Sequence, residues 1–306
     1  GKQHEAHWPS GPRRGEREMT VLGRGRANGG VSVLHAAGTG RGCSVGIELM
    51  TEVSLVSDQT PVLEDEHSIL DSVVAVWTDS GYPDPGVVGW MVNSDVPIGQ
   101  GLKSSAALAC AAARALNQAS WTGLSDFDIV DIAVAAQRRA GCTITGSMDD
   151  CWAAISPGWK LVDPSLSSRD SILLEGDAEA DLAVLIVLRG PRQLEVRPES
   201  FAEQHKLFER ALASLSSGST LSAMSANGMA VAAATGDDEA LRICNSAIAR
   251  GAIAAGLSGS GPAIAIVCYQ QGAEQLAEAM SESGLQIIRS AFVEPAPLDE
   301  EASSWE

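Results

Sequence analysis

The chain has 306 residues, 45% of them hydrophobic, which is enough for one large domain or two ordinary domains with a proper core. Its formal net charge of -18 argues against binding to nucleic acid or anionic membranes, because an acidic surface repels phosphate groups. No apolar stretch reaches the roughly 18 residues of a membrane span, and residues 1–18 lack the apolar core of a secretion signal.

The first half of the chain alternates between short strands and helices. Residues 1–18 are expected to be an N-terminal extension, with ordered sequence from about Met19. The elements predicted after it are strands at 31–35 and 45–56 around the glycine-rich turn AAGTGRGC, a helix at 66–78, a strand at 87–96, helices at 104–117 and 125–140, and a strand at 159–163. For the helix at 125–140 we expect Ser125 as the N-cap and Gly141 as the stop.

The polar stretch 164–180 is read as a domain boundary, which gives an N-terminal domain at 19–165, a C-terminal domain at 166–298 and an acidic tail at 299–306. The second domain is predicted to contain a strand at 182–190, helices near 198–216, 219–234 and 237–254, a strand at 262–270, a helix at 272–283 and a strand at 285–293. This order favours an α+β half with helices on one face of a small antiparallel sheet.

The segment VPIGQGLKSS (96–105) leads from a predicted strand into the alanine-rich helix. It is not a Walker loop, because no glycine stands six residues before Lys103, and the dinucleotide fingerprint fails at Ser104. Its glycines nevertheless let the backbone approach a ligand, and the free amides of a helix start favour an anion. The plainer alternative is a glycine loop that only leads into a packed helix.

Two further segments have both a functional and a structural interpretation. Asp149 and Asp150 are adjacent carboxylates between apolar residues, which would be costly to bury without a role, yet one of them could cap a helix at 151–156. The glycine-rich loop GLSGSGPA (256–263) closes a phosphate site or is an ordinary tight turn before a strand. His35, at a strand end, is more typical of a satisfied structural histidine than of a functional one.

The six cysteines form no C-x-x-C pair and have no histidine at metal-ligand spacing. This pattern indicates buried free thiols in a reducing compartment, and we expect a cytoplasmic protein. No partner protein is evident from the sequence.

The segment PIGQGLKSSAA resembles the ATP-binding signature of the GHMP kinases, P-x-G-x-G-L-G-S-S-A. It departs from that signature at Lys103, where most members have Gly or Ser, and the form GLKSS is similar to the archaeal-type shikimate kinase branch. AAGTGRGCSVGIEL (36–49), AGCTITGSMDD (140–150) and GLSGSGPA are similar to further motifs of this family, in the same order. The resemblance covers residues 20 to 295 and implies a two-domain α+β fold with the active site in the cleft between the domains.

The resemblance also implies the residues that bind ATP. They are Pro97, Ile98, Gly99, Gln100, Gly101, Leu102, Lys103, Ser104, Ser105, Ala106 and Ala107 in the first loop, and Gly259, Ser260 and Gly261 in the last. Ser105 is the implied ligand of Mg²⁺. Several family members place a Glu shortly before the aspartate motif to hold this ion, but residues 132–148 contain no acidic residue.

An aspartate is implied beside the acceptor hydroxyl, where it takes the proton or orients the hydroxyl. The G-x-M-D spacing points to Asp149, whereas the distance to Gly158 points to Asp150, which we favour as the catalytic residue. Thr145 and Gly146 belong to the same motif and are expected to contact the substrate. Arg41 is the cation expected for the substrate carboxylate, because arginine suits bidentate carboxylate contact; the alternative is that it is only a surface charge.

The implied activity is transfer of the γ-phosphoryl group of ATP, with Mg²⁺, to the 3-hydroxyl of shikimate, a step of aromatic amino-acid biosynthesis. Such a transfer depends on positioning and charge stabilisation. Two alternatives stay open: a kinase for another alcohol such as homoserine or mevalonate, and an inactive GHMP fold that only binds a ligand.

Overall fold

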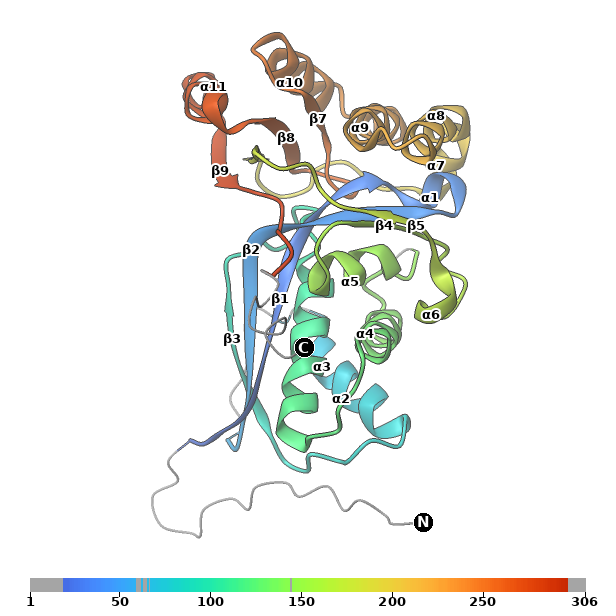
Figure 1. Ribbon diagram of the computed structural model, residues 1–306, viewed down its shortest axis with the longest axis vertical. Coiled ribbons are helices and arrows are strands. Elements are labelled where there is room, and N and C mark those ends of the chain that lie inside the picture. The colour runs from blue at the N-terminus through green and yellow to red at the C-terminus, as the bar shows by residue number, and fades with distance from the viewer. Residues whose placement is uncertain (1–18, 59–61, 63–64, 66, 144, 297–306) are drawn as a thin grey trace, which may run out of the picture.

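The computed structural model describes residues 19–58, 62, 65, 67–143 and 145–296. The expected N-terminal extension and acidic tail lie outside these residues. The molecule is elongated, with helices α2 to α5 beside a long sheet in one half and a second layer of sheet and helices in the other (Figure 1).

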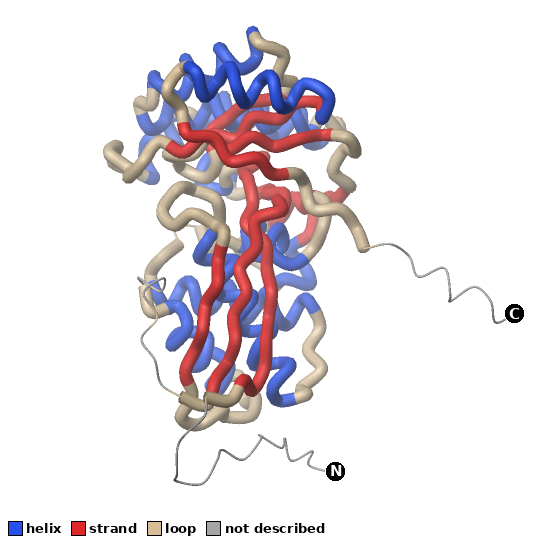
Figure 2. Tube along the Cα trace, turned by 90° about the vertical axis from the view of Figure 1, so that its left-hand side faces the viewer, coloured by secondary structure: helices blue, strands red, loops and turns tan. Residues whose placement is uncertain are grey.

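The long sheet has five strands in the order β1-β2-β4-β5, with β3 also paired to β2. They are β1 (Val21–Leu34), β2 (Gly42–Val56), β3 (Gly89–Ser94), β4 (Trp159–Val162) and β5 (Ile172–Gly176). All neighbours are antiparallel, and β2 is central because β3 pairs with its C-terminal part and β4 with its N-terminal part. Figure 2 shows the long strands side by side in the lower half, with helices behind them.

The helices of the first half pack on one face of this sheet. They are α2 (Ile69–Asp79), α3 (Ser104–Ser120), α4 (Asp126–Ala140) and α5 (Met148–Ile155), with the short helices α1 (Ala36–Thr39) and α6 (Ser168–Ser171) at the ends of strands. The prediction for α4 is confirmed, since Ser125 forms a capping box with Asp128 and Gly141 ends the helix in the left-handed region.

The alanine-rich sequence of α3 is explained by how closely this helix lies on β1. A Cβ atom at Gly23 or Gly25 of β1 would collide with the carbonyl oxygens of Ala115 and Ala111 in α3. Only small residues on both elements permit this distance. β1 is therefore a strand from Val21 onward, not only over 31–35, because α3 and β2 hold a glycine- and arginine-rich segment that has low strand propensity of its own.

The second half contains a four-stranded antiparallel sheet of order β7-β8-β6-β9. Its strands are β6 (Leu182–Leu188), β7 (Ala254–Leu257), β8 (Ile264–Tyr269) and β9 (Gln286–Ser290). Its helices are α7 (Pro198–Glu203), α8 (His205–Ser216), α9 (Thr220–Thr235), α10 (Asp238–Ala249) and α11 (Gln270–Glu282), and they lie above the sheet in Figure 1. The predicted small antiparallel sheet with helices on one face is confirmed.

Two sequence-based boundaries differ from the structure. The helix predicted at 237–254 ends at Ala249, because Gly251 has a φ of 106° and the following residues pair with β8 as strand β7. The first sheet runs past residue 165 to Gly176, because β5 pairs with β4. The segment 166–176 therefore belongs with the first half.

One buried cluster spans both halves, and a second lies between the first sheet and α2 to α5. Val31 and Ile47, from the ends of β1 and β2, pack in the same buried cluster as Val184 of β6. After β9, Phe292 forms a bridge with Ile47, and the amide of Val293 donates to the carbonyl of Gly46 at 3.0 Å. Among the helices that the structure describes, none has the length and apolar character needed to cross a bilayer.

Candidate active site

A pocket of about 330 Å³ lies where the two halves meet. Its walls include the end of β1, the loop before α3 and the first turn of that helix, Thr143 and residues 145–150, and the loop 258–261 before β8. Segments far apart in the sequence thus supply a single site, and both halves of the molecule contribute to it.

The loop before α3 has the shape of an anion cradle. Gly99 and Gly101 have φ values of 70° and 85°, and a Cβ atom at Gly101 would collide with the carbonyl oxygen of Ser258. Ser104 and Ser105 form the first turn of α3 and line the pocket, so the unpaired amides of the helix start face it. A phosphate group fits the chemistry of this end of the pocket.

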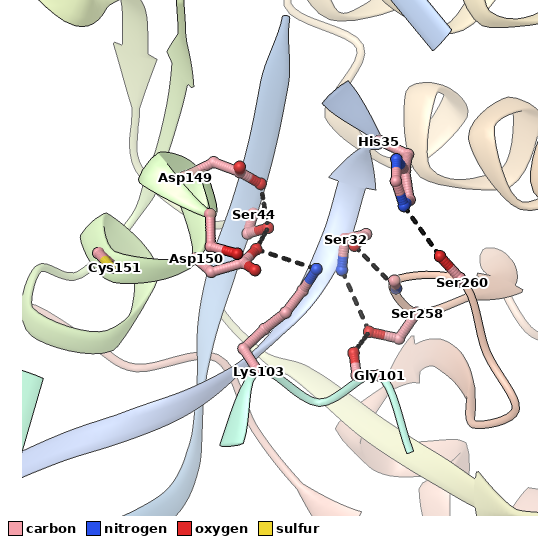
Figure 3. Close-up of polar contacts among 12 residues, drawn as sticks. Ser32, His35, Ser44, Gly101, Lys103, Asp149, Asp150, Cys151, Ser258 and Ser260 are labelled. Carbon is pink, nitrogen blue, oxygen red and sulfur yellow. Dashed lines mark hydrogen bonds and ion pairs between the residues drawn. The ribbon is translucent and has the colours of Figure 1, made fainter. Parts of the chain in front are cut away.

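Lys103 and Asp150 form an ion pair at the centre of the site, with Nζ 3.0 Å from Oδ1 (Figure 3). Their side chains are 9% and 17% exposed. Lys103 precedes α3 and Ser147 precedes α5, and both adopt the left-handed region although neither is glycine, with φ values of 65° and 53°. Such strain is held by the surrounding structure and is frequent at functional sites.

Asp149 lies behind Asp150 and is 5% exposed. The hydroxyl of Ser44, on β2, lies 2.6 Å from Asp149 Oδ2 and 3.2 Å from Asp150 Oδ1, so it can donate its single proton to one of the two carboxylates at a time. A Cβ atom at Gly42 would collide with Asp149, so this glycine of β2 makes room for the carboxylate. Both aspartates belong to the first turn of α5, whose N-cap is Ser147, so neither caps the helix as one alternative proposed.

The surroundings shift the pKa values of the two carboxylates in opposite directions. Burial, and then the charge of Asp150, raises the pKa of Asp149 to about 7. Burial also opposes the charge of Asp150, but the nearby Lys103 outweighs it and holds the pKa of Asp150 below its usual value. Burial likewise disfavours the Lys103 charge, yet Asp150 and Asp149 raise the pKa of this ammonium. At neutral pH, Asp150 is a carboxylate and Lys103 is charged.

The loop 258–261 is fixed to β1 and to the loop before α3. The Ser258 hydroxyl donates to the carbonyl oxygen of Gly101 at 2.7 Å and accepts from the amide of Ser32 at 3.4 Å. The amide of Gly259 donates to the Ser32 hydroxyl at 2.9 Å. The two glycine-rich loops therefore meet directly and enclose the anion-binding end of the pocket.

Most of the residues predicted to bind ATP line this pocket. Those that line it are Ile98, Gly99, Gly101, Lys103, Ser104, Ser105, Ala106, Gly259 and Ser260. Pro97, Gln100, Leu102, Ala107 and Gly261 do not line it. Two of them make backbone contacts instead: the carbonyl of Leu102 accepts the amide proton of Gly30 at 3.0 Å, and the carbonyl of Gln100 accepts that of Ala263 at 2.9 Å.

The structure places one of the three predicted substrate-binding residues on the pocket wall and the other two away from it. Thr145 lines the pocket, but Gly146 does not, because it packs against the guanidinium of Arg138. Arg41 also lies off the pocket wall, and its guanidinium pairs with Asp163 at 3.2 Å. Among the described residues, Arg192 is the arginine that lines the pocket, where it donates to the carbonyls of Ser260 and Gly261.

Sequence reasoning missed Arg192, Ser44 and Ser32. Ser44 stands within the motif AAGTGRGCSVGIEL, which gave a signal that the segment matters but not which side chain acts. Arg192 stands in a polar connection after β6, where nothing in its neighbours distinguishes it from a surface charge.

The acidic residues of the pocket are few. Asp149 and Asp150 line it together with the hydroxyl of Ser105 and the buried amide of Gln137. Within the described ranges, no three His, Cys, Asp or Glu side chains gather in a way that could hold a metal ion. The donors present suit Mg²⁺ bound largely through phosphates, since this ion commonly takes only one or two carboxylates from the protein.

Comparisons with known proteins identify the family of the chain. The model of the GHMP kinases N terminal domain matches residues 70–158, and that of the GHMP kinases C terminal domain matches residues 199–285. The chain is 31% identical to the shikimate kinase of Pyrococcus abyssi over 282 residues, which cover 88% of this chain and 99% of that protein. It is also 31% identical to the shikimate kinase of Thermococcus kodakarensis over 85% of this chain and 97% of that protein.

Solved structures with the same fold include two mevalonate kinases. That of L. major in complex with R-mevalonate has a TM-score of 0.68 at 16% identity and covers 94% of this chain and 100% of its own. That of Methanococcus jannaschii has a TM-score of 0.65 at 14% identity and covers 92% and 100%. With its two family domains and full-length relatives, the chain belongs to the GHMP kinase family.

Proposed function

We propose that this protein is a cytoplasmic, ATP-dependent shikimate kinase, which forms 3-phosphoshikimate and ADP. The observation that carries the proposal is the 31% identity to the Pyrococcus abyssi shikimate kinase over nearly the full length of both chains. The pocket supports it, because an anion cradle and an ionised aspartate stand side by side, as phosphoryl transfer to an alcohol requires.

The phosphates of the nucleotide would occupy the loop before α3. The amides at the start of α3 and the ammonium of Lys103 would balance their charge, since buried donors act strongly where water is excluded. The Ser105 hydroxyl and the carboxylate of Asp150 are the groups best placed to meet Mg²⁺, which supplies further charge neutralisation when bound. In the proposed complex Lys103 therefore interacts both with the carboxylate of Asp150 and with the phosphates of the nucleotide.

Asp150 would face the acceptor hydroxyl. Its lowered pKa keeps it a carboxylate at neutral pH, so it can accept a hydrogen bond from the hydroxyl, orient it, and take its proton as the phosphoryl group is transferred. Asp149, whose pKa is about 7, lies behind it and shares the Ser44 hydroxyl. We assign Asp150 the direct role and Asp149 a supporting one.

We propose Arg192, in place of Arg41, as the cation for the substrate carboxylate. Arg192 lines the pocket, whereas Arg41 is paired with Asp163 away from it. Replacing Arg192 by alanine is expected to raise the KM for shikimate roughly 10-fold or more, because a charged hydrogen bond is lost. Arg41→Ala should leave this KM within about twofold. Steady-state kinetics at saturating ATP measure both, and a larger effect at Arg41 than at Arg192 would reverse the assignment.

The experiment that tests the proposed function is a panel of acceptor alcohols. Purified protein is incubated with Mg-ATP and shikimate, homoserine or mevalonate, and ADP release is followed for each. The proposal expects ADP release that depends on shikimate and a product with one phosphate added to shikimate. Turnover of homoserine or mevalonate without turnover of shikimate would replace it by another GHMP kinase activity, and ATP binding without any turnover would indicate a binding protein.

A further inference from the structure

Both ring nitrogens of His35 have fixed partners. The backbone amide of Ala37 donates to Nδ1 at 3.1 Å, so Nδ1 carries a lone pair and the proton of the neutral ring stands on Nε2. Nε2 lies 3.1 Å from the hydroxyl oxygen of Ser260 and therefore donates to it (Figure 3). His35 is the N-cap of α1, but this structural role uses only one of its two ring nitrogens.

The orientation of the ring is held from several sides. The backbone amide of His35 donates to the side-chain oxygen of Asn227, in α9, at 2.8 Å, and the Phe201 ring lies 4.7 Å from the imidazole, centroid to centroid. Burial, with the nearby charge of Lys103, lowers the pKa of His35 to about 3. The ring is therefore neutral at neutral pH, and its Nε2 proton stays directed at Ser260.

This arrangement determines which hydrogen bonds the Ser260 hydroxyl can form. Its oxygen accepts from His35, so its own proton is left to be donated to a third group. Ser260 lines the pocket beside Gly259, and Arg192 holds its carbonyl oxygen at 3.0 Å. The backbone on both sides is thus fixed, and the pocket wall at this point faces the loop before α3, where an anion is expected.

We propose that His35 is a positioning residue for nucleotide binding: it keeps the Ser260 hydroxyl oriented so that this hydroxyl donates a hydrogen bond to a phosphate oxygen of the bound nucleotide. The inference rests on the proposed function only for the identity of the ligand, a nucleoside triphosphate. In this role His35, which follows β1, does not touch the ligand. It acts on the ligand only through Ser260 of the loop 258–261.

The test is a double-mutant cycle on ATP binding, measured by calorimetry without an acceptor. His35→Asn keeps an oxygen near the position of Nδ1, so it can still cap α1, but it lacks the donor that reaches Ser260. His35→Gln is the matched control, because its longer amide can supply a donor near the position of Nε2. Ser260→Ala and the double variant His35→Asn with Ser260→Ala complete the cycle, and melting curves check the fold of each.

The proposal expects each of His35→Asn and Ser260→Ala to weaken ATP binding roughly 10-fold or more, the loss of a hydrogen bond to a charged group. The double variant should bind no more weakly than either single variant, because both changes remove the same hydrogen bond. His35→Gln should retain most of the wild-type affinity. The proposal would be overturned if His35→Asn lowered the ATP affinity by the same factor in the wild-type and the Ser260→Ala backgrounds. It would also be overturned if Ser260→Ala alone did not lower the ATP affinity.

Two features keep the test decisive. If His35→Asn fails to fold, the proposal can still be tested by Ser260→Ala and by the ¹⁵N resonances of His35 in the wild-type protein. The proposal expects these resonances to show the neutral ring with its proton on Nε2 from pH 5 to pH 8. A protonated ring or the other tautomer in that range would overturn the proposal. Because binding is measured with ATP alone, the failure of shikimate turnover would contradict the proposed function without affecting this result.

Discussion

At the scale of residues, the site depends on two adjacent carboxylates that are made chemically different. Asp150 gains a charged partner, Lys103, at 3.0 Å, whereas Asp149 is buried beside a like charge. One carboxylate is therefore ionised at neutral pH while the other is close to its midpoint. Pairs whose pKa values are pushed apart in this way commonly divide the roles of an active site between them.

The raised pKa of Asp149 makes a prediction about stability. The folded protein binds a proton that the unfolded chain releases above about pH 4, so the stabilisation from protonated Asp149 is complete below pH 4 and is lost as pH rises through about 7. Asp149→Asn cannot ionise and keeps an oxygen for Ser44. We expect this variant to exceed the wild type in free energy of unfolding at pH 8, by about 4 kcal/mol at most.

Urea unfolding at pH 4, 6 and 8 measures this difference. The gap between variant and wild type should be small at pH 4 and widen with each step. A difference between variant and wild type that stays the same at all three pH values would show that the pKa of Asp149 does not change on folding, and would contradict its raised pKa.

At the scale of elements, the two glycine-rich loops approach each other very closely at Gly101. Gly99 and Gly101 both have left-handed φ values, but only the added Cβ of Gly101 would meet another atom, the carbonyl oxygen of Ser258. Glycine is therefore favoured at position 99 by the left-handed backbone conformation alone. At position 101 it is required both by that conformation and by the close contact with the other loop.

Gly101→Ala and Gly99→Ala separate these two requirements. Gly99→Ala should cost about 1–2 kcal/mol in free energy of unfolding, the penalty of an L-residue in the left-handed region. Gly101→Ala should cost clearly more and should also weaken ATP binding, because the loop 258–261 must move. Urea unfolding and calorimetry measure the two effects, and equal losses in both variants would mean that the loops do not constrain each other.

The elements that sequence reasoning found are those with local causes. α4 was predicted with both ends, because Ser125, Asp128 and Gly141 fix them through neighbouring backbone groups. The first part of β1 was not predicted, since its strand conformation comes from α3 and β2 packing against it. β7 (Ala254–Leu257) was not predicted for the same reason: its pairing partner β8 lies outside the local sequence.

At the scale of the whole molecule, the pocket exists because the two halves share a core and bring their loops together. Lys103 and Asp150 come from the first half, and Ser258 to Gly261 from the second. The glycine-rich segments could be identified from their order along the chain. The partners of each side chain could not, since Arg41 and Arg192 are distinguished only by where the fold points them.

The central claim is that phosphoryl transfer takes place in this pocket with Asp150 beside the acceptor hydroxyl. The measurement that tests it most directly is the turnover of Asp150→Asn with Mg-ATP and shikimate, alongside ATP affinity by calorimetry. We predict that the substitution slows turnover by a factor of about 100 or more, the typical contribution of a positioned acid or base, and that ATP binding measured without Mg²⁺ is not weakened. Turnover of Asp150→Asn close to that of the wild type would contradict the claim.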